Sequence, residues 1–189
     1  MSPANIATLI RILLIPVFAV LAVRYGESIE AGSPDEKLRW LALSAFILAA
    51  AGDGIDGWMA RKYGKTRLGA ILDPLCDKVL MLVGLIVLSQ VAWGEEGWII
   101  PAWYVVMVVA RDVSIGLGCL FVILTGKTLQ LNTNWTGKAT TVAQLIALGW
   151  VMLKIVPFSP IIPTVVAAVF TLWSSWFYVR EALRQLDPK

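Results

Sequence analysis

Long apolar runs, separated by short polar segments, make up most of this sequence. They cover approximately residues 6–24, 39–60, 68–93, 98–125, 137–156 and 160–179. Each run approaches the roughly 20 residues that a membrane-spanning helix requires. The runs are continuously apolar and lack the short alternation of barrel strands, and a helix satisfies its own backbone hydrogen bonds in lipid. The pattern therefore predicts an all-α integral membrane bundle of six transmembrane helices.

The composition supports this prediction. Hydrophobic residues make up 58% of the 189 residues, charged residues make up 15%, and the mean hydropathy is +0.76, all far from a soluble domain. The first run, Ile12 to Val23 behind Arg11, has the length of a secretory signal, but Pro16 interrupts it and the later runs would keep the protein in the membrane. We expect it to be the first helix. Without internal repeats or long linkers, residues 1–189 are expected to form one domain.

Lysine and arginine residues gather in alternate connections between the runs and in the tail. They are Arg61, Lys62, Lys65 and Arg67, then Lys127 and Lys138, then Arg180, Arg184 and Lys189. The positive-inside rule places both termini on the cytoplasmic side of the cytoplasmic membrane. The net charge of +3 reflects this bias, and no basic stripe indicates a nucleic acid. Interfacial anchoring is expected of the tryptophans near run ends, Trp40, Trp93, Trp98, Trp135 and Trp176.

Four aspartates lie at the end of the second run and the start of the third. Asp53 and Asp56 are three residues apart. Asp73 and Asp77 are four apart, so each pair shares one face of a helix. The basic stretch 61–67 between the pairs contains a glycine and predicts a short turn between antiparallel helices. Carboxylates at a bilayer edge are destabilising unless a cation or polar cavity compensates them, so we expect the two acidic faces to meet around a cation.

Oxygen ligands alone favour a hard metal ion. The chain contains no histidine, which is the commonest zinc ligand and the usual general base. Oxygen ligands favour Mg²⁺, Mn²⁺ or Ca²⁺ over zinc or copper. Of these, Mg²⁺ or Mn²⁺ is the expected cofactor, since Mg²⁺ commonly fills its remaining positions with substrate phosphates. Four carboxylates suffice for two ions flanking a pyrophosphate. A general base in this chain must then be a carboxylate.

These positions resemble the signature of the CDP-alcohol phosphatidyltransferases. That signature is Asp, two residues, Asp-Gly, two residues, Ala-Arg, about eight residues, Gly, three residues, Asp, three residues and Asp. The matching residues here are Asp53, Asp56, Gly57, Ala60, Arg61, Gly69, Asp73 and Asp77. The spacing departs at one place, because seven residues separate Arg61 from Gly69. The missing residue falls in the predicted turn, where a shortening could alter the nucleotide pocket.

The resemblance implies transfer of a phosphatidyl group from CDP-diacylglycerol to an alcohol, with CMP as the leaving group. It implies that the four aspartates hold the metal ions, and that Asp77 is also the catalytic base that removes the proton of the acceptor hydroxyl. It implies further that the cytidine diphosphate is contacted by Asp56, Gly57, Ala60, Arg61 and Gly69. The charge pattern places this site on the cytoplasmic side, where a soluble nucleotide can leave.

Further stretches bear on the acceptor. The opening 5–18 resembles the start of bacterial phosphatidylglycerophosphate synthases and of cardiolipin synthases, which implies glycerol 3-phosphate or phosphatidylglycerol as the acceptor. Arg111 lies beside Asp112 in the fourth run and either lines the acceptor site or forms an internal ion pair. Lys138 opens the fifth run and either meets an acceptor phosphate or extends its charge to the membrane surface.

The sequence favours glycerol 3-phosphate over phosphatidylglycerol as the acceptor by only a small margin. Glycerophosphate synthases often carry a second lysine where this chain has Thr140, and its absence leans toward cardiolipin synthesis. Most short bacterial chains with this opening resemble glycerophosphate synthases, which puts glycerol 3-phosphate ahead. A homodimer is compatible with either enzyme. The alternative from another class is a small ion-coupled transporter, but repeated halves would be expected of it and none are visible.

Overall fold

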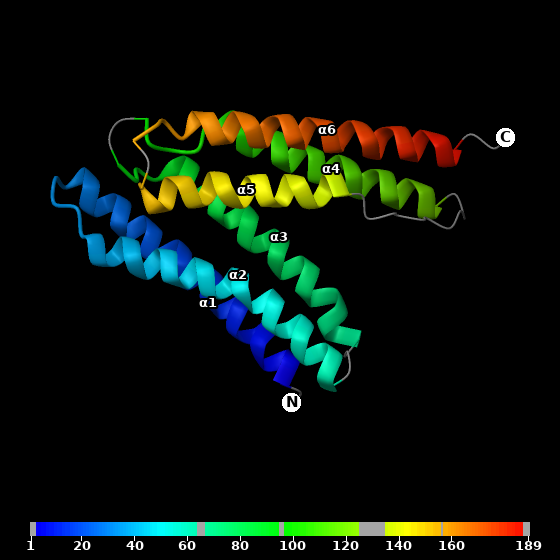
Figure 1. Cartoon of the computed structure of the whole chain (residues 1–189), viewed down its shortest axis with the longest axis horizontal. Helices are drawn as coiled ribbons and strands as arrows, with labels where there is room; N and C mark the ends of the chain where they lie inside the picture. Colours follow the sequence, from blue (N-terminus) through cyan, green and yellow to red (C-terminus); the bar gives the residue numbers. More distant parts are fainter. Residues whose placement is uncertain (1–2, 64–66, 95–96, 125–134, 156, 187–189) are drawn as a thin grey trace. The chain divides into compact units, whose positions relative to one another are not determined.

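The structure, a computed structural model, contains helices and no strand in the part of the chain that it describes. It describes the backbone of residues 3–63, 67–94, 97–124, 135–155 and 157–186, and the side chains in these ranges except 3–7, 53–63, 67–74, 119, 122–123 and 182–186. The helices are α1 (Pro3–Glu30), α2 (Glu36–Tyr63), α3 (Arg67–Gln90), α4 (Ala102–Leu124), α5 (Trp135–Leu153) and α6 (Ile161–Leu186) (Figure 1). Their bounds follow the apolar runs to within about two helical turns, which confirms the all-α prediction.

The chain divides into two compact units. Residues 1–99 with 151–155 form the first unit, and residues 100–150 with 156–189 form the second. Helices α1, α2 and α3 therefore belong to the first unit, and α4, α6 and most of α5 belong to the second. The expectation that the whole chain forms one domain stays a prediction.

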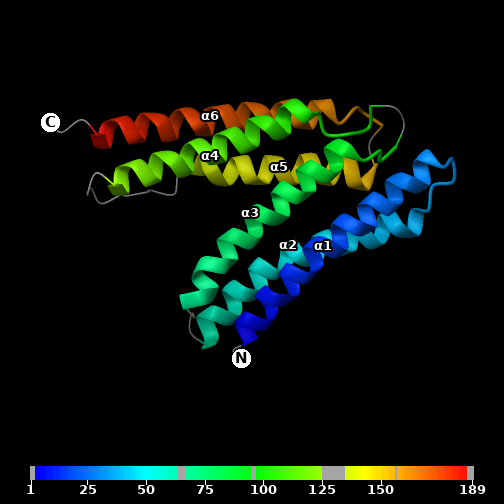
Figure 2. The same ribbon diagram turned by 180° about the vertical axis from the view of Figure 1, so that it is seen from behind.

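In the first unit, α1 lies along α2, and α3 packs against both (Figures 1 and 2). Six buried residues of α1 recur every three or four positions, namely Thr8, Arg11, Ile15, Phe18, Ala22 and Tyr25. This spacing turns one narrow stripe of α1, here called the buried stripe, toward the other helices. Ala42, Ala49 and Gly52 give α2 small buried residues, which let helix backbones approach closely. Arg11 is charged, whereas its companions in the stripe are apolar or neutral.

Pro16 lies inside α1 and does not end the helix. The expectation that the first run forms the first helix is therefore confirmed. The Pro16 side chain is exposed beside the buried Ile15. Membrane helices tolerate proline because neighbouring groups and small local adjustments satisfy the freed carbonyl oxygen.

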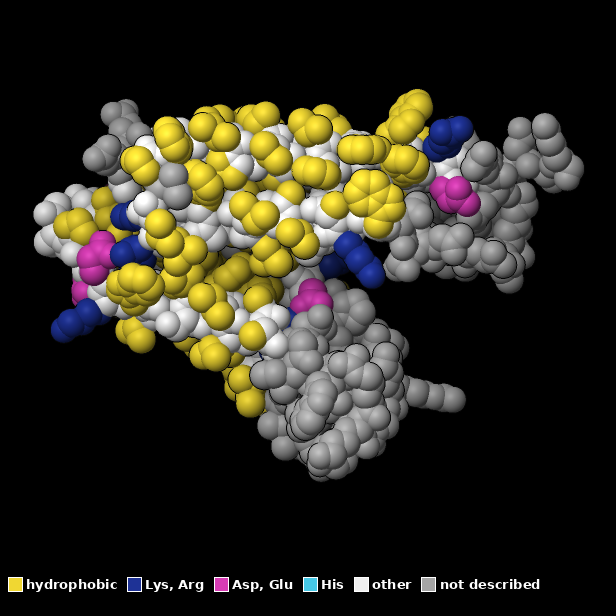
Figure 3. Space-filling view, viewed as in Figure 1, with side chains coloured by type: hydrophobic (Ala, Val, Ile, Leu, Met, Phe, Trp, Pro, Cys, Tyr) yellow, Lys and Arg dark blue, Asp and Glu magenta, His cyan; other side chains and the backbone are white. Residues whose placement is uncertain are grey.

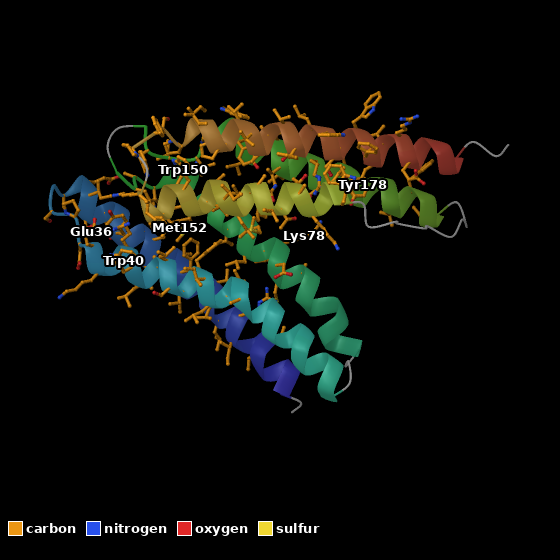
Figure 4. All side chains as sticks on the ribbon, in the orientation of Figure 1. Glu36, Trp40, Lys78, Trp150, Met152 and Tyr178 are labelled. Carbon is orange, nitrogen blue, oxygen red and sulfur yellow. The ribbon has the colours of Figure 1, made fainter. Side chains whose placement is uncertain are left out.

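At one end of the first unit, Arg39 links the start of α2 to the end of α5. Its Nη1 donates hydrogen bonds to the carbonyl oxygens of Met152 and Leu153, at 3.2 and 3.0 Å. These carbonyls lie in the last turn of α5, where a helix leaves acceptors without partners of its own. Lys154 follows in the left-handed conformation, with φ of 51°, and ends the helix. Figure 4 shows Met152 and Glu36 at this end.

A second link joins Lys154 to α1 and α2 through Tyr25. Lys154 Nζ donates to the Tyr25 hydroxyl at 2.6 Å, and that hydroxyl donates to Glu36 at 3.1 Å. The Trp93 ring packs against Tyr25 with 5.0 Å between ring centroids, and Trp93 is fully buried. The prediction that Trp93 anchors the chain at the membrane interface is therefore wrong. Trp40 is exposed, as expected of an anchor.

In the second unit, α4 packs against α6, and α5 also contacts α6. Thr140 Oγ1 donates to the carbonyl oxygen of Phe170 at 3.1 Å. Trp135 and Trp173 meet edge to face, with 5.9 Å between ring centroids. Two buried hydroxyls of α6, those of Thr164 and Thr171, each donate to the carbonyl oxygen four residues back at 2.7 Å. These hydroxyls are thus satisfied without water, as a membrane interior requires.

Large apolar side chains cover much of the face that Figure 3 shows. Exposed large apolar residues occur in both units and include Leu13, Leu48, Val106 and Val169. Soluble proteins rarely expose so many large apolar side chains, so this surface suits a lipid environment. Over the described residues, two segments, Thr8–Glu30 and Ile161–Glu181, are long and apolar enough to cross a membrane by length and composition. The crossing of all the helices stays a prediction.

Glu36 gives the first unit a pH-dependent stability. Burial by itself raises the pKa of Glu36, but hydrogen bonds from Arg39 and Tyr25 and the charges of Arg39 and Lys154 outweigh burial and hold the pKa below 4.5. The unfolded chain therefore binds more protons in this range, so the stability that Glu36 contributes is present above pH 4.5 and is lost as the pH falls. We expect Glu36→Gln to lower the thermal unfolding midpoint in detergent by a few degrees at neutral pH. Well below pH 4.5, the variant and the parent protein should unfold at the same midpoint.

The matched control for this prediction is Glu27→Gln. Glu27 forms an exposed surface pair with Arg24 at 3.3 Å, and such pairs contribute little. Its midpoint should follow the parent protein at every pH. A deficit of Glu36→Gln that stays constant from neutral to acidic pH would contradict the prediction.

Candidate functional site

The four predicted metal ligands lie on two helices that contact each other. Asp53 and Asp56 lie near the end of α2, and Asp73 and Asp77 lie near the start of α3. The backbone is helical through all these positions, so the predicted spacing within each pair holds. The end of α2 and the start of α3 lie side by side in both ribbon views (Figures 1 and 2). The side chains of Asp53, Asp56 and Asp73 lie outside the described residues, so their convergence stays a prediction.

The predicted nucleotide contacts fall in the same region. Gly57, Ala60 and Arg61 lie on α2 and Gly69 lies on α3, in helical backbone whose side chains are outside the described residues. Residues 64–66, which include the predicted short turn, are outside them as well. The roles of these residues in holding cytidine diphosphate therefore stay predictions.

Arg11 of α1 connects the two acidic helices. Its side chain is only 2% exposed, because it lies in the buried stripe. Nε donates to the carbonyl oxygen of Ala49 on α2 at 2.8 Å, and Nη2 donates to Oδ1 of Asp77 on α3. The Asp77 side chain is 42% exposed, so a buried cation is paired with a carboxylate at the edge of the unit. One side chain thus contacts both helices near the aspartates.

Gly52, the residue before Asp53, makes room for this arginine. A Cβ atom at position 52 would lie 2.5 Å from Cδ and 2.7 Å from Cγ of Arg11, closer than side-chain carbons approach in proteins. These atoms belong to the packed stem of the side chain, so they cannot move aside without displacing the guanidinium. Glycine therefore allows α1 and α2 to approach closely while Arg11 keeps its hydrogen bonds.

The donor chemistry at Asp77 fits the predicted metal ion. Asp77 is the one predicted ligand among the described side chains, and those side chains contain no group of three or more ligands that could hold a metal. Its donors are carboxylate oxygens and the chain offers no imidazole, so Mg²⁺ or Mn²⁺ fits better than zinc. The arginine beside it does not exclude a metal ion, because a carboxylate has about four lone-pair sites.

In the second unit, three neighbours hold the guanidinium of Arg111. Nη1 lies 2.7 Å from Oδ1 of Asp112, and Nη2 donates to Ser174 Oγ at 2.9 Å. The guanidinium carbon lies 5.5 Å from the centroid of the Tyr178 ring, within the range of a cation–π interaction. The Arg111 side chain is 14% exposed. The internal ion pair considered for Arg111 and Asp112 is therefore present, and its role at an acceptor site stays a prediction.

The start of α5 lies against the same tyrosine. A Cβ atom at Gly137 would lie 3.1 Å from the Tyr178 hydroxyl oxygen, and Figure 4 shows Tyr178 on α6 beside α5. Lys138, the other predicted acceptor residue, follows and is exposed. Thr136 Oγ1 and Arg111 Nε are buried and have no hydrogen-bond partner in the part of the chain that the structure describes. Tyr178 of α6 thus contacts Arg111 of α4 and lies against Gly137 of α5.

Comparison with known proteins decides the family. The family model of CDP-alcohol phosphatidyltransferase matches residues 1–178. The chain belongs to the CDP-alcohol phosphatidyltransferase family. The resemblance of the aspartate signature is confirmed, and the protein is a membrane-bound transferase.

Curated relatives cover nearly the whole of this phosphatidyltransferase. A protein named probable phosphatidylglycerophosphate synthase from Mycobacterium tuberculosis (strain H37Rv) is 32% identical over 190 aligned residues, which cover 97% of this chain and 82% of the relative. A protein named CDP-diacylglycerol–glycerol-3-phosphate 3-phosphatidyltransferase from Escherichia coli K12 is 31% identical over 187 residues, covering 96% and 95% of the two chains. A relative of the same name from Shigella sonnei matches to the same extent.

Three residues that contact the candidate side chains Asp77 and Arg111 of this phosphatidyltransferase are not identified from the sequence. They are Arg11, Ser174 and Tyr178. Arg11 carries a usable signal, because a charged residue inside a predicted span needs a polar or ionic partner there. Ser174 carries none, since serine in membrane helices commonly bonds to its own backbone. Tyr178 falls near a span end, where a tyrosine is expected as an interfacial anchor.

The contact between Gly52 and Arg11 can be tested by Gly52→Ala. Overpacking of this kind costs about 1–3 kcal/mol, so we expect the thermal unfolding midpoint to fall by roughly 2–10 °C. The matched control is Gly149→Ala in α5, where an added Cβ meets nothing within 4 Å. That change should be neutral or stabilising by up to about 1 kcal/mol, because alanine favours helix. Equal effects of the two substitutions would disprove the close contact at Gly52.

Proposed function

We propose that this phosphatidyltransferase transfers the phosphatidyl group of CDP-diacylglycerol to glycerol 3-phosphate and releases CMP. The observation that carries the proposal is the aspartate signature, set on the contacting helices α2 and α3 with Asp77 held by Arg11. The names of the relatives from M. tuberculosis and E. coli support glycerol 3-phosphate as the acceptor. Phosphatidylglycerol is the alternative acceptor, which would make the protein a cardiolipin synthase.

The proposed site residues have different roles in the reaction, namely metal binding, proton acceptance and nucleotide binding. Asp53, Asp56, Asp73 and Asp77 would hold two Mg²⁺ or Mn²⁺ ions, which when bound supply positive charge to the diphosphate. Asp77 accepts the proton of the acceptor hydroxyl as the oxygen of that hydroxyl bonds to the phosphatidyl phosphorus. The bond from this phosphorus to the bridging oxygen then breaks, and CMP leaves with that oxygen. The cytidine diphosphate is held by Asp56, Gly57, Ala60, Arg61 and Gly69.

The acceptor phosphate is bound by Arg111 and Lys138 in this proposal. A phosphate monoester carries close to two negative charges, and a guanidinium recognises it through paired hydrogen bonds. Asp112, Ser174 and Tyr178 orient the Arg111 guanidinium, which limits the rotamer entropy lost on binding. Lys138 is exposed at the start of α5, in the same unit, and supplies a second positive charge.

The same reaction requires access from the cytoplasm. We place both termini and the aspartates on that side, with all the helices crossing the membrane as a single domain. The basic connection around Arg61 and the basic residues after Tyr178 support this orientation. CMP would then leave into water, and the lipid product would stay in the bilayer.

Release of CMP tests the proposal directly. The purified full-length protein in detergent micelles is supplied with CDP-diacylglycerol, Mg²⁺ and one acceptor at a time: glycerol 3-phosphate, phosphatidylglycerol, serine or inositol phosphate. We expect release with glycerol 3-phosphate at a rate at least about tenfold above the other acceptors, which amounts to about 1.4 kcal/mol of discrimination. Release with phosphatidylglycerol alone would assign cardiolipin synthesis instead.

Chelation is the control for this assay. EDTA in excess should stop CMP release, and Mg²⁺ or Mn²⁺ should restore it, because the carboxylates need a cation to hold the diphosphate. Turnover that resists the chelator would remove the metal from the mechanism. Failure to release CMP with every acceptor would remove the transferase assignment itself.

Asp77→Asn tests the proposed base. The change removes a charge but little volume, so we expect CMP release to fall by at least about 100-fold while membrane insertion changes little. The unfolding midpoint should fall as well, because the buried Arg11 loses its carboxylate partner. The matched control is Asp35→Asn, which removes the same charge at the start of α2. Asp35 Oδ1 accepts a hydrogen bond from the Lys37 backbone nitrogen at 3.0 Å, a capping contact that asparagine also makes. Near-normal turnover of Asp77→Asn would exclude Asp77 as the base.

A further inference from the structure

Arg11 occupies a position in α1 that packing alone does not explain. The buried stripe of α1 places a residue against α2 or α3 at every three or four positions, and at Ile15 and Phe18 those residues are apolar. At Arg11 the stripe instead holds a charged side chain that is 2% exposed. An apolar residue of similar length would fill the space without the desolvation of a cation. The position therefore requires a contribution that depends on the charge.

The partner of Arg11 indicates what this contribution is. Asp77 lies on α3 at the end that also carries Asp73, and α2 carries Asp53 and Asp56 at the adjoining end. Four carboxylates at the ends of two contacting helices repel one another when no cation is present. Arg11 donates to one of these carboxylates and also to the backbone of α2 at Ala49. It is thus placed to oppose the repulsion and to fix the spacing of the two helices.

We propose that Arg11 is a positioning residue that fixes the Asp77 carboxylate and serves as the internal counter-cation of the acidic site. The inference rests on the proposed function in one respect, namely that these carboxylates bind divalent metal ions. In the metal-free protein, Arg11 supplies positive charge that keeps the acidic ends of α2 and α3 together. In the metal-bound protein, Arg11 and the metal share Asp77, so the arginine weakens metal binding while it keeps the carboxylate in place.

The neutral variant Arg11→Met separates this role from simple packing. Removal of the guanidinium charge should strengthen the attraction of the carboxylates for a divalent ion, and this electrostatic gain outweighs the entropy of one freed side chain. We expect the dissociation constant for Mn²⁺, measured by electron paramagnetic resonance, to fall about tenfold. The rise in unfolding midpoint between EDTA and 1 mM Mn²⁺ should exceed the parent value by roughly 4 °C. CMP release should slow, because Asp77 loses its restraint.

Further variants separate charge from geometry. Arg11→Lys keeps the charge but cannot reach Ala49 and Asp77 together, so its response to Mn²⁺ should match the parent while CMP release falls. Arg11→Gln is neutral and keeps a donor for Ala49, so it should show the enlarged response to Mn²⁺ that is expected of Arg11→Met. It replaces the methionine variant in the test if that variant does not fold. Arg24→Met is the matched control on the same helix, because Arg24 is exposed and pairs with Glu27. Its response to Mn²⁺ should equal that of the parent.

The outcomes decide between the roles. A purely structural arginine would lower the unfolding midpoint by the same amount with and without Mn²⁺, and that result would overturn the proposal. Weaker Mn²⁺ binding by both neutral variants would overturn it as well. The metal and stability measurements need no turnover, so they are independent of the CMP assay. A parent protein that binds Mn²⁺ as expected but releases no CMP would contradict the proposed function and leave the role of Arg11 standing.

Discussion

The guanidinium of Arg11 on α1 forms polar contacts with α2 and α3, in a membrane protein where the hydrophobic effect contributes little to helix association. Lipid chains are as apolar as the side chains that they touch, so helix association in a membrane depends on close packing and on polar contacts. Arg11 provides such contacts to Ala49 on α2 and to Asp77 on α3. Breaking a buried ion pair costs about 3–5 kcal/mol, and the 42% exposure of Asp77 reduces that figure here. One side chain thus contacts both of the helices that carry the four aspartates.

The residues of α2 that pack against Arg11 lie directly beside the first proposed metal ligand. Gly52 accommodates the stem of Arg11, and Asp53 follows it directly in the chain. Any change that moves α1 away from Gly52 therefore also moves Arg11 relative to the first proposed metal ligand. Ala49, one turn earlier, is buried and supplies the carbonyl oxygen that Arg11 uses. Small residues on this face of α2 therefore set both the helix separation and the location of the site.

The sequence predicts the helices well and their buried faces poorly. Long apolar runs identify the elements, because a membrane helix must be apolar over its length. The same property hides the core, since Leu13 and Val17 are exposed while Ile15 and Phe18 are buried, and all four are apolar. Because no face of such a helix is polar, the sequence lacks the hydrophobic periodicity that would identify the buried face. Trp93 is a similar case, because a tryptophan near a span end suits either an interface or a core.

The aspartate pairs are predictable because they are local. Each pair lies on one helix, and the helices adjoin in the chain, so spacing alone predicts that the carboxylates lie at the same end. The contact between Arg11 and Asp77 joins residues 66 positions apart, and the contact between Arg111 and Ser174 joins residues 63 apart. Contacts at that separation depend on tertiary packing, which a single sequence does not specify. Donor chemistry is therefore easier to infer than the arrangement that positions it.

The choice of acceptor shows how a structural contact changes the weight of a sequence feature. The absence of a second lysine at position 140 leans toward phosphatidylglycerol when only charge is considered. The Thr140 side chain, however, is buried and donates to the carbonyl oxygen of Phe170 at 3.1 Å, so position 140 packs against α6 in this chain. A lysine there would have to bury its charge or push α5 away from α6. The threonine thus reflects helix packing, and its presence does not by itself argue against glycerol 3-phosphate.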